Sequence, residues 1–470
     1  MLAEWDVIIV GAGSAGIPAA IFAANRGAKV LQIEADEKIG GTLFMSSGQI
    51  SAAGTKRQKK FNIEDTAEEH YLDAQRIADN SIDPILGKLA IDNAGSTYDW
   101  LESIGYNPIA DHPVAGSAHE PYLTRRYHWA ENAAIGILDV LKPIHSKLVE
   151  ENKIDIRLKT KMKDIIINDK NNVKGVTVTT DEDSFNFYGK NILLTTGGYS
   201  HNHSMWKQIT PDIPLRSWSN KFSQGDGIKA AEKIGAKVDG SEKFLCTFAG
   251  VLEDPNDPFS TSLGMQFNPL IREPWEIYVN IHGKRFLRED HPSVHHREHS
   301  LLKQPKQEFF IIFDEKIRQN APPINPSLAN EINQKYGNHP NYHKANSIEE
   351  LAVKLNIPFS NLNNTIEKYN LAITSKEDKD FGRVRMFRKI ETPPYYAIHA
   401  GGITVVSPAG LNANSNLEVL DKKNKPISNL FAAGEILGFT RLSGSAFVNG
   451  MSLMPALTFG KILGEKILKW

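Results

Sequence analysis

A glycine turn between an apolar strand and a helix constrains the fold of this chain more than any other feature. The motif GAGSAG, residues 11–16, follows directly after the apolar run Trp5–Val10. A short β-branched run bounded by glycine is typical of a buried parallel strand. Residues 14–26 are predicted to form a helix, and Lys29–Ile33 a second strand. The sequence therefore predicts an α/β fold built on a Rossmann-type βαβ unit.

Each glycine of this turn has a physical purpose in a dinucleotide site. Gly11 permits the tight turn, Gly13 lets a pyrophosphate approach the backbone, and Gly16 lets helix and strand pack closely. The helix that follows offers unpaired N–H groups and the positive end of its dipole. Glu34 ends the second strand, 23 residues after Gly11, where a carboxylate binds the ribose hydroxyls. The predicted contacts are Gly11, Gly13, Ser14, Ala15, Gly16 and Glu34.

Three later segments bear on which dinucleotide is bound. Gly40–Thr42 resembles the flavoprotein continuation of this motif. Leu193–Gly198 resembles the internal ATGG element, and Asn429–Glu435 resembles the C-terminal flavin-contacting strand and loop. No second GxGxxG lies in a βαβ pattern, so the sequence gives no sign of a built-in NAD(P)H domain. These segments indicate FAD as the bound cofactor.

Four motifs together resemble the flavoprotein family of soluble fumarate reductases and 3-ketosteroid dehydrogenases. They are Gly40–Thr55, Ser223–Gly227, Asn280–Phe286 followed by Glu289, and Gly450–Gly460. The resemblance implies a discontinuous FAD-binding domain from residues 1–240 and 380–470. An inserted α+β capping domain, residues 241–379, would cover the substrate at the isoalloxazine. The resemblance also implies flavin contacts at Gly41, Thr42, Ser47, Gly48, Gly197, Gly198, Asp226, Gly434, Glu435, Ser452 and Leu453.

The family's chemistry moves a hydride between flavin N5 and one carbon of a C–C bond beside a carbonyl or carboxylate. A side chain moves a proton at the other carbon, and the electron-withdrawing group makes that proton acidic. The resemblance thus implies a small carboxylate or ketone substrate and an external electron acceptor or donor. The ketosteroid-like C-terminal motif favours the dehydrogenase direction, as does the lack of an electron-input domain.

Two arginines and a tyrosine are candidates for the substrate chemistry. Arg441 resembles the fumarate reductase arginine that clamps a substrate carboxylate, a task that suits a bidentate, permanently charged guanidinium. Arg272 stands thirteen residues before Arg285, like the arginine of that family's proton-delivery path. Tyr396 falls on the tyrosine of the ketosteroid dehydrogenase PxYA element. For Arg272 and Arg441 the alternative is a structural ion pair, and for Tyr396 it is packing.

The chain also departs from the fumarate reductase pattern. The catalytic arginine expected four residues after Glu289 is replaced by Ser293, and Val405–Gly410 replaces the segment with the substrate histidine. Fumarate itself is therefore not the expected substrate. Four histidines follow the cap motif, at 291, 295, 296 and 299; we expect an acid/base role for His295 rather than a metal site.

Composition excludes several other classes of protein. Lys and Arg number 54 against 55 Asp and Glu, which leaves no basic surface for nucleic acid. The single cysteine, Cys246, excludes an internal disulfide, a cysteine zinc site and an iron–sulfur cluster. No long apolar run or targeting signal is evident, so a cytoplasmic protein is expected. The basic run Lys56–Lys60 is expected to be a solvated loop.

Two alternatives remain open from the sequence. One is a flavin monooxygenase or amine oxidase, which the cap motif does not match. The other is a non-catalytic flavin-binding interaction protein, which the lost fumarate reductase residues would allow. A ketosteroid-like ketone dehydrogenase is the alternative within the family.

Overall fold

The computed structural model describes residues 5–116, 119–170, 172–262 and 267–467. Its contacts group the chain into two compact units. The first takes residues 1–210, 219–244 and 406–470, and the second takes residues 211–218 and 245–405. Residues 380–405, placed in the FAD-binding domain by the sequence motifs, group with the second unit. The reason is that strand β15 (Tyr395–Ile403) pairs with strands of that unit.

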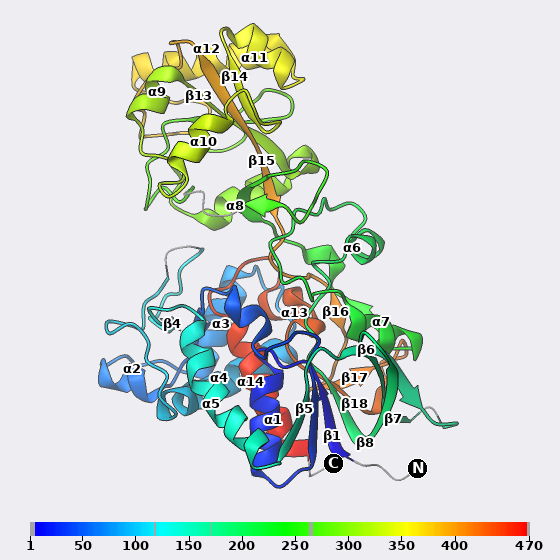
Figure 1. Cartoon of the computed structure of the whole chain (residues 1–470). Helices are drawn as coiled ribbons and strands as arrows, with labels where there is room; N and C mark the ends of the chain where they lie inside the picture. Colours follow the sequence, from blue (N-terminus) through cyan, green and yellow to red (C-terminus); the bar gives the residue numbers. More distant parts are fainter. Residues whose placement is uncertain (1–4, 117–118, 171, 263–266, 468–470) are drawn as a thin grey trace. The chain divides into compact units, whose positions relative to one another are not determined.

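A mostly parallel sheet forms the centre of the first unit (Figure 1). Its strand order is β17-β18-β8-β1-β2-β5, and only β17 runs antiparallel to its neighbour. Strand β1 is almost wholly buried, as expected of a strand covered on both faces. The bounds are β1 (Trp5–Val10), β2 (Val30–Ile33), β5 (Ile154–Arg157), β8 (Ser184–Leu194), β17 (Glu418–Leu420) and β18 (Pro426–Ala432).

Four helices pack together on one side of this sheet (Figure 1). They are α1 (Gly16–Asn25), α4 (Leu86–Ser103), α5 (Ile135–Glu150) and α14 (Leu453–Lys466). Helices α1 and α14 approach closely because α14 carries glycine at the contact. A Cβ on Gly460 would lie 2.1 Å from the Ala15 carbonyl oxygen. This packing holds the start of α1, and with it the glycine turn, against the sheet.

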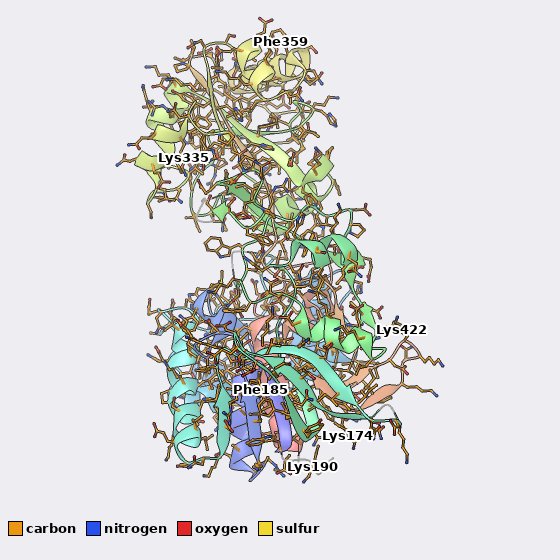
Figure 2. All side chains as sticks on the ribbon, turned by 45° about the vertical axis from the view of Figure 1, so that its right-hand side comes forward. Lys174, Phe185, Lys190, Lys335, Phe359 and Lys422 are labelled. Atoms are coloured by element: carbon orange, nitrogen blue, oxygen red, sulfur yellow. The ribbon has the colours of Figure 1, made fainter. Side chains whose placement is uncertain are left out.

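An antiparallel meander extends the sheet in the first unit. Strand β6 (Lys161–Ile167) pairs with β7 (Val173–Thr179), which pairs with the first half of β8. The second half of β8 pairs with β1, and Lys190 there forms an ion pair with Asp6 (Figure 2). The sequence predicts strands near residues 163–168 and 173–179, joined by a hairpin turn at Asp169–Asn172. The β6–β7 pairing confirms this hairpin, although position 171 lies outside the described residues. Helix α7 (Asp226–Lys233) packs on β6.

The sequence shows helical patterns around residues 67–104, and the structure forms two helices there, α3 (Ala67–Ile77) and α4. Between them, Asp79 and Asn80 adopt positive φ angles of 50° and 56° and reverse the chain. The remaining elements of the unit are short: η1 (Gly41–Phe44), β3 (Ile50–Ser51), β4 (Tyr127–His128), α6 (His203–Ile209), β9 (Val238–Asp239), η2 (Ser241–Lys243), β16 (Gly410–Leu411), η4 (Glu435–Leu437) and α13 (Phe439–Ser443).

The solvated loop predicted at Lys56–Lys60 is wrong, because these residues form helix α2. The Thr55 hydroxyl accepts from the Gln58 N–H, and the Gln58 side chain accepts from the Thr55 N–H. This capping box satisfies the first turn. The Arg57 guanidinium donates to the Glu102 carboxylate at 3.1 Å and to the His112 carbonyl at 2.8 Å. Charge content alone missed the Thr-x-x-Gln capping signature.

The second unit has a six-stranded sheet of order β11-β10-β15-β13-β12, with β14 also paired to β15. Its core holds Phe248, Tyr278 and Phe309, whose ring centroids lie 5.1–5.8 Å apart. The strands are β10 (Thr247–Leu252), β11 (Thr261–Ser262), β12 (Ile277–Asn280), β13 (Glu308–Asp314), β14 (Tyr342–Ala345) and β15.

Five α-helices and a 3₁₀ turn complete the second unit as described. They are α8 (Val294–Leu302), η3 (Pro305–Gln307), α9 (Glu315–Asn320), α10 (Ala329–Lys335), α11 (Ile348–Lys354) and α12 (Phe359–Ser375). The polar and apolar periodicity of residues 348–372 predicts one helical stretch. The structure breaks it before Pro358, and Phe359 then begins α12 (Figure 2). Across the described ranges of both units, no helix has the length and apolar character that a membrane span requires.

Candidate functional site

The glycine turn connects β1 to α1, and two of its glycines are required by packing (Figure 1). Gly11 has a φ of +110°, and a Cβ there would lie 2.3 Å from the Thr195 carbonyl oxygen. A Cβ on Gly16 would lie 2.0 Å from the Gly11 carbonyl oxygen. A Cβ on Gly13 would meet no described atom within 4 Å. Gly13 therefore leaves open space beside the backbone, as the approach of a phosphate requires.

Glu34 lies at the carboxyl end of β2, beside the turn. Its Oε2 accepts from the Ala12 N–H at 2.7 Å, and its Oε1 accepts from the Asp36 N–H at 2.8 Å. Burial raises the pKa of this carboxyl above its ordinary value, although the two N–H groups oppose the shift. The carboxylate is thus fixed in position while its oxygens keep further lone pairs for donors.

These residues line an open cavity of about 860 Å³ within the first unit. Eleven of the predicted cofactor contacts line it: Gly11, Gly13, Ser14, Ala15, Glu34, Gly41, Thr42, Gly197, Asp226, Gly434 and Glu435. Segments far apart in the sequence thus converge at the carboxyl edge of the parallel strands, where ligands of such sheets bind.

The cavity offers donors suited to a pyrophosphate. The N–H groups of Gly13, Ser14 and Ala15 bond to no acceptor among the residues described. They precede α1, whose dipole favours an anion at this end. The Thr196 hydroxyl is buried and has no hydrogen-bond partner in the described part of the chain. Lys161 also lines the cavity, where it pairs with Asp226 at 3.3 Å. A dinucleotide such as FAD fits this donor set.

The other predicted contacts lie outside the lining of this cavity. Gly16 and Gly198 are packing positions; a Cβ on Gly198 would lie 2.0 Å from the Ser407 hydroxyl. Gly48 has a φ of +73° and packs against the backbone of Ala133 and Ala134. Three more lie at element ends: Ser47 is exposed beyond η1, Ser452 is the N-cap of α14, and Leu453 is its first residue.

Other residues that line the cavity were not predicted from the motifs. They come from Thr160, Lys161 and Met162 after β5 and from Asn220 and Phe222 before α7. The Thr160 N–H donates to the Glu34 carbonyl at 2.9 Å because β5 lies beside β2 in the sheet. The sequence offers only a short strand pattern near residues 155–158, and its place beside β2 is known from the structure alone.

Comparison with known proteins identifies the family to which this chain belongs. The family model described as "FAD binding domain" matches residues 6–449, nearly the whole chain. The chain belongs to this FAD-binding family. FAD is its cofactor, and the protein is an FAD-dependent oxidoreductase of the group that includes soluble fumarate reductases and 3-ketosteroid dehydrogenases.

Three similar proteins illustrate this group. A probable fumarate reductase, Ifc3 of Shewanella frigidimarina, is 29% identical over 99% of this chain and 75% of its own length. The vinyl phenol reductase of Lactiplantibacillus plantarum is 26% identical over 92% of this chain and 89% of its own. The solved 3-ketosteroid delta1-dehydrogenase of Sterolibacterium denitrificans has the same fold, with a TM-score of 0.77, 19% identity and 99% coverage of both chains.

Arg441 lies in the first unit of this oxidoreductase, on α13, between two carboxylates. Its Nη1 lies 2.7 Å from Asp83 Oδ2, and its Nη2 lies 3.3 Å from Asp239 Oδ2. Its Nε is buried without a hydrogen-bond partner among the described residues. Asp239 also pairs with Lys237 at 2.9 Å. Both Nη groups of Arg441, which would bind a substrate carboxylate, are thus already occupied.

Arg272 lies in the second unit and is also paired. Its Nη1 and Nη2 donate to the two oxygens of Glu276 at 2.8 and 2.9 Å, a bidentate buried pair. The Tyr278 hydroxyl donates to the same carboxylate at 3.1 Å. Burial opposes ionisation of Glu276, but Arg272 outweighs it and holds the pKa of that carboxyl below its ordinary value. Arg272 and Glu276 line a second cavity of about 530 Å³ in this unit.

Tyr396 is a buried residue of β15. Its hydroxyl donates to Glu315 Oε2 at 2.7 Å, and its ring stacks on Phe313 with centroids 5.5 Å apart. Burial, and then the bond to Glu315, raise the pKa of the phenol to about 12. The phenol therefore stays protonated at neutral pH, and its proton is directed at Glu315.

Helix α8 carries a buried arginine close to the position where the family pattern has its cap arginine. Ser293, the residue at the expected position, is the N-cap of α8, and its hydroxyl accepts from the His296 N–H at 3.2 Å. One helical turn later, Arg297 is almost fully buried, 5.4 Å from the centroid of the Phe248 ring. Its Nε and Nη1 have no hydrogen-bond partner within the described ranges. Burial lowers the pKa of Arg297 below its ordinary value.

The four histidines on α8 or just before it contact one another through their rings, in two pairs. His295 and His299 have ring centroids 4.2 Å apart, as do His291 and His296. Among the described residues, no group of three or more His, Cys, Asp or Glu side chains has the arrangement of a metal site. Arg297 is the functional candidate that counting from Glu289 overlooked.

Proposed function

We propose that this flavoenzyme reduces a C=C bond conjugated to a single ketone or carboxylate, and that a dicarboxylate is not its substrate. Bound FAD, in its reduced form, supplies the hydride to one carbon of the bond. The chain must then bind the electron-withdrawing group, hold the charge that develops there, and deliver a proton to the other carbon. Relatives named as reductases, of fumarate and of vinyl phenol, favour the reductive direction over the dehydrogenation suggested by the C-terminal motif.

The first unit holds FAD in this proposal. The free N–H groups at Gly13, Ser14 and Ala15 bind the pyrophosphate, and Glu34 binds the ribose hydroxyls. Asp226, Gly434 and the other cavity residues predicted from the motifs surround the remainder of the cofactor.

The observation that carries the substrate proposal is the state of Arg297. A guanidinium keeps its charge even when burial lowers its pKa, because its ordinary pKa is above 12. A buried cation without hydrogen-bond partners costs free energy unless a ligand supplies them. The ketone or carboxylate oxygen of a substrate is such a partner, and its negative charge grows as the hydride is added. Arg297 therefore takes the polarising role in this account.

The ion pairs of Arg441 support a substrate with at most one anionic group. A second carboxylate would need a free cation, yet both Nη groups of Arg441 are already paired, with Asp83 and Asp239. An additional anion placed there would have to displace one of these carboxylates. We assign Arg441 to holding α13 in place, leave the proton transfer to His295, and treat Arg272 and Tyr396 as partners of Glu276 and Glu315.

An anaerobic panel of acceptors tests the proposal. The purified holoenzyme is reduced with dithionite, mixed with fumarate, acrylate or cyclohex-2-enone, and followed by the return of flavin absorbance. Re-oxidation by acrylate or cyclohex-2-enone, with fumarate inert, is the expected result. Rapid re-oxidation by fumarate would overturn the substrate class, and silence of all three would overturn the proposed reaction.

Variants of two arginines sharpen the same test. Arg297→Met should abolish re-oxidation while the protein retains FAD, and Arg297→Lys should keep part of it. Arg288→Met is the matched control, since Arg288 lies nearby and already pairs with Asp290 at 2.7 Å. Equal effects of Arg297→Met and Arg288→Met would remove Arg297 from the site.

A further inference from the structure

The peptide group between Gly11 and Ala12 is hydrogen-bonded on both sides, to Gln32 on β2 and to Glu34 directly after β2. The Gln32 Nε2 donates to the Gly11 carbonyl oxygen at 3.1 Å. The N–H of Ala12, at the other end of the same peptide, donates to Glu34 at 2.7 Å. Gln32 and Glu34 are two residues apart on one strand, so they lie on the same face. The plane of the Gly11–Ala12 peptide is therefore fixed by two side chains from the neighbouring strand.

A buried histidine determines the orientation of the Gln32 amide. His145 Nε2 lies 2.7 Å from Gln32 Oε1, and both side chains are almost inaccessible to solvent. The Gly11 oxygen is only an acceptor, so the amide nitrogen must face it and the amide oxygen must face His145. His145 Nε2 then has to carry the proton. Burial lowers the pKa of His145 to about 4, which keeps the ring neutral in neutral solution.

Burying the polar side chains of Gln32 and His145 costs free energy. Gln32 replaces the apolar residue typical of a parallel strand buried on both faces. A buried amide is tolerated only when its polar atoms are paired, and His145 on α5 supplies the pairing from 113 residues away. The pairing fixes the start of the glycine turn, because Gly11 is its first residue. Gly13, Ser14 and Ala15 follow in the same turn.

We propose that His145 and Gln32 are positioning residues for the FAD pyrophosphate, acting through the Gly11–Ala12 peptide and not by contact with the cofactor. The three free N–H groups at residues 13–15 bind well only if the preceding peptide keeps its orientation. Thr195 Oγ1 also donates to the Gly11 oxygen, at 2.9 Å, so the peptide keeps this bond and the bond from the Ala12 N–H to Glu34 when Gln32 is lost. The turn then loosens while the fold persists.

Release of FAD from the holoenzyme measures this role. Flavin fluorescence rises as FAD leaves the diluted protein, and the unfolding midpoint is recorded for each variant. His145→Leu and Gln32→Leu should each speed release about three- to tenfold, the range of one lost hydrogen bond. His145→Gln is the rescue, because a glutamine amide nitrogen reaches the place of Nε2, and it should release FAD at nearly the wild-type rate.

The matched control is Leu148→Ala, a buried position one turn further along α5 with no bond to the turn. It should lower the unfolding midpoint without a comparable rise in FAD release. In the double variant, the effects of His145→Leu and Gln32→Leu should not add, because both break the same chain. Equal release from Leu148→Ala and His145→Leu, or full additivity, would overturn the proposal. So would wild-type release from Gln32→Leu.

Discussion

Gly13 and Gly16 belong to one motif, yet the structure predicts opposite consequences for the same alanine substitution. A methyl group on Gly13 meets no described atom within 4 Å and needs no positive φ, so Gly13→Ala should fold. The free energy of unfolding without FAD should change by less than about 1 kcal/mol. The methyl group occupies the approach of the pyrophosphate. Displacing two charge-assisted hydrogen bonds costs about 3–6 kcal/mol, or about a hundredfold or more in the Kd for FAD.

Gly16→Ala should show the reverse pattern. Its Cβ would lie 2.0 Å from the Gly11 carbonyl oxygen and 2.7 Å from the Thr195 hydroxyl, so the backbone itself must shift. Overpacking of this kind costs about 1–3 kcal/mol of stability. Urea unfolding of the apoprotein and titration with FAD separate the two effects. Normal FAD affinity in Gly13→Ala, or unchanged apoprotein stability in Gly16→Ala, would refute the geometry of the turn.

Three further predictions concern buried polar groups. Arg441→Met should cost about 1–2 kcal/mol in urea unfolding by leaving Asp83 unpaired, and adding Asp83→Asn should restore part of it. Hydrogen bonds from Arg318 and from the Tyr396 hydroxyl outweigh burial, which acts in the opposite direction, and hold the pKa of Glu315 at about 2. Its stabilisation is therefore complete above its ordinary pKa and is lost as pH falls towards 2; Tyr396→Phe should move that loss to higher pH in acid-unfolding curves. The lowered pKa of His145 should weaken the fold as pH falls from about 6.5 to 4, and His145→Gln should remove that part of the slope.

The local parts of the FAD site were predictable from the sequence. The glycine turn and Glu34 lie within one βαβ unit, where periodicity and glycine spacing set the geometry over a short stretch of chain. The walls at Thr160 and Phe222 were not predictable in this way. They depend on strand order, since β5 reaches the cavity only because it lies beside β2.

The surroundings of the predicted substrate residues were not predictable for a different reason. Counting four residues from Glu289 led to Ser293, but that residue begins α8, and the buried arginine comes one turn later at Arg297. The ion pairs of Arg441 join residues 358 and 202 positions away in the chain. Residue spacing within a motif carries no information about such partners, whereas it carried most of the information about the FAD turn.

The rate at which cyclohex-2-enone re-oxidises the reduced enzyme tests the central claim most directly. Stopped-flow absorbance would compare wild type, Arg297→Met and Arg288→Met at matched FAD content. The account predicts a loss of about a hundredfold or more for Arg297→Met, the range for removal of one donor to a developing oxyanion, and no loss for Arg288→Met. An Arg297→Met enzyme that re-oxidises at the wild-type rate would contradict the account.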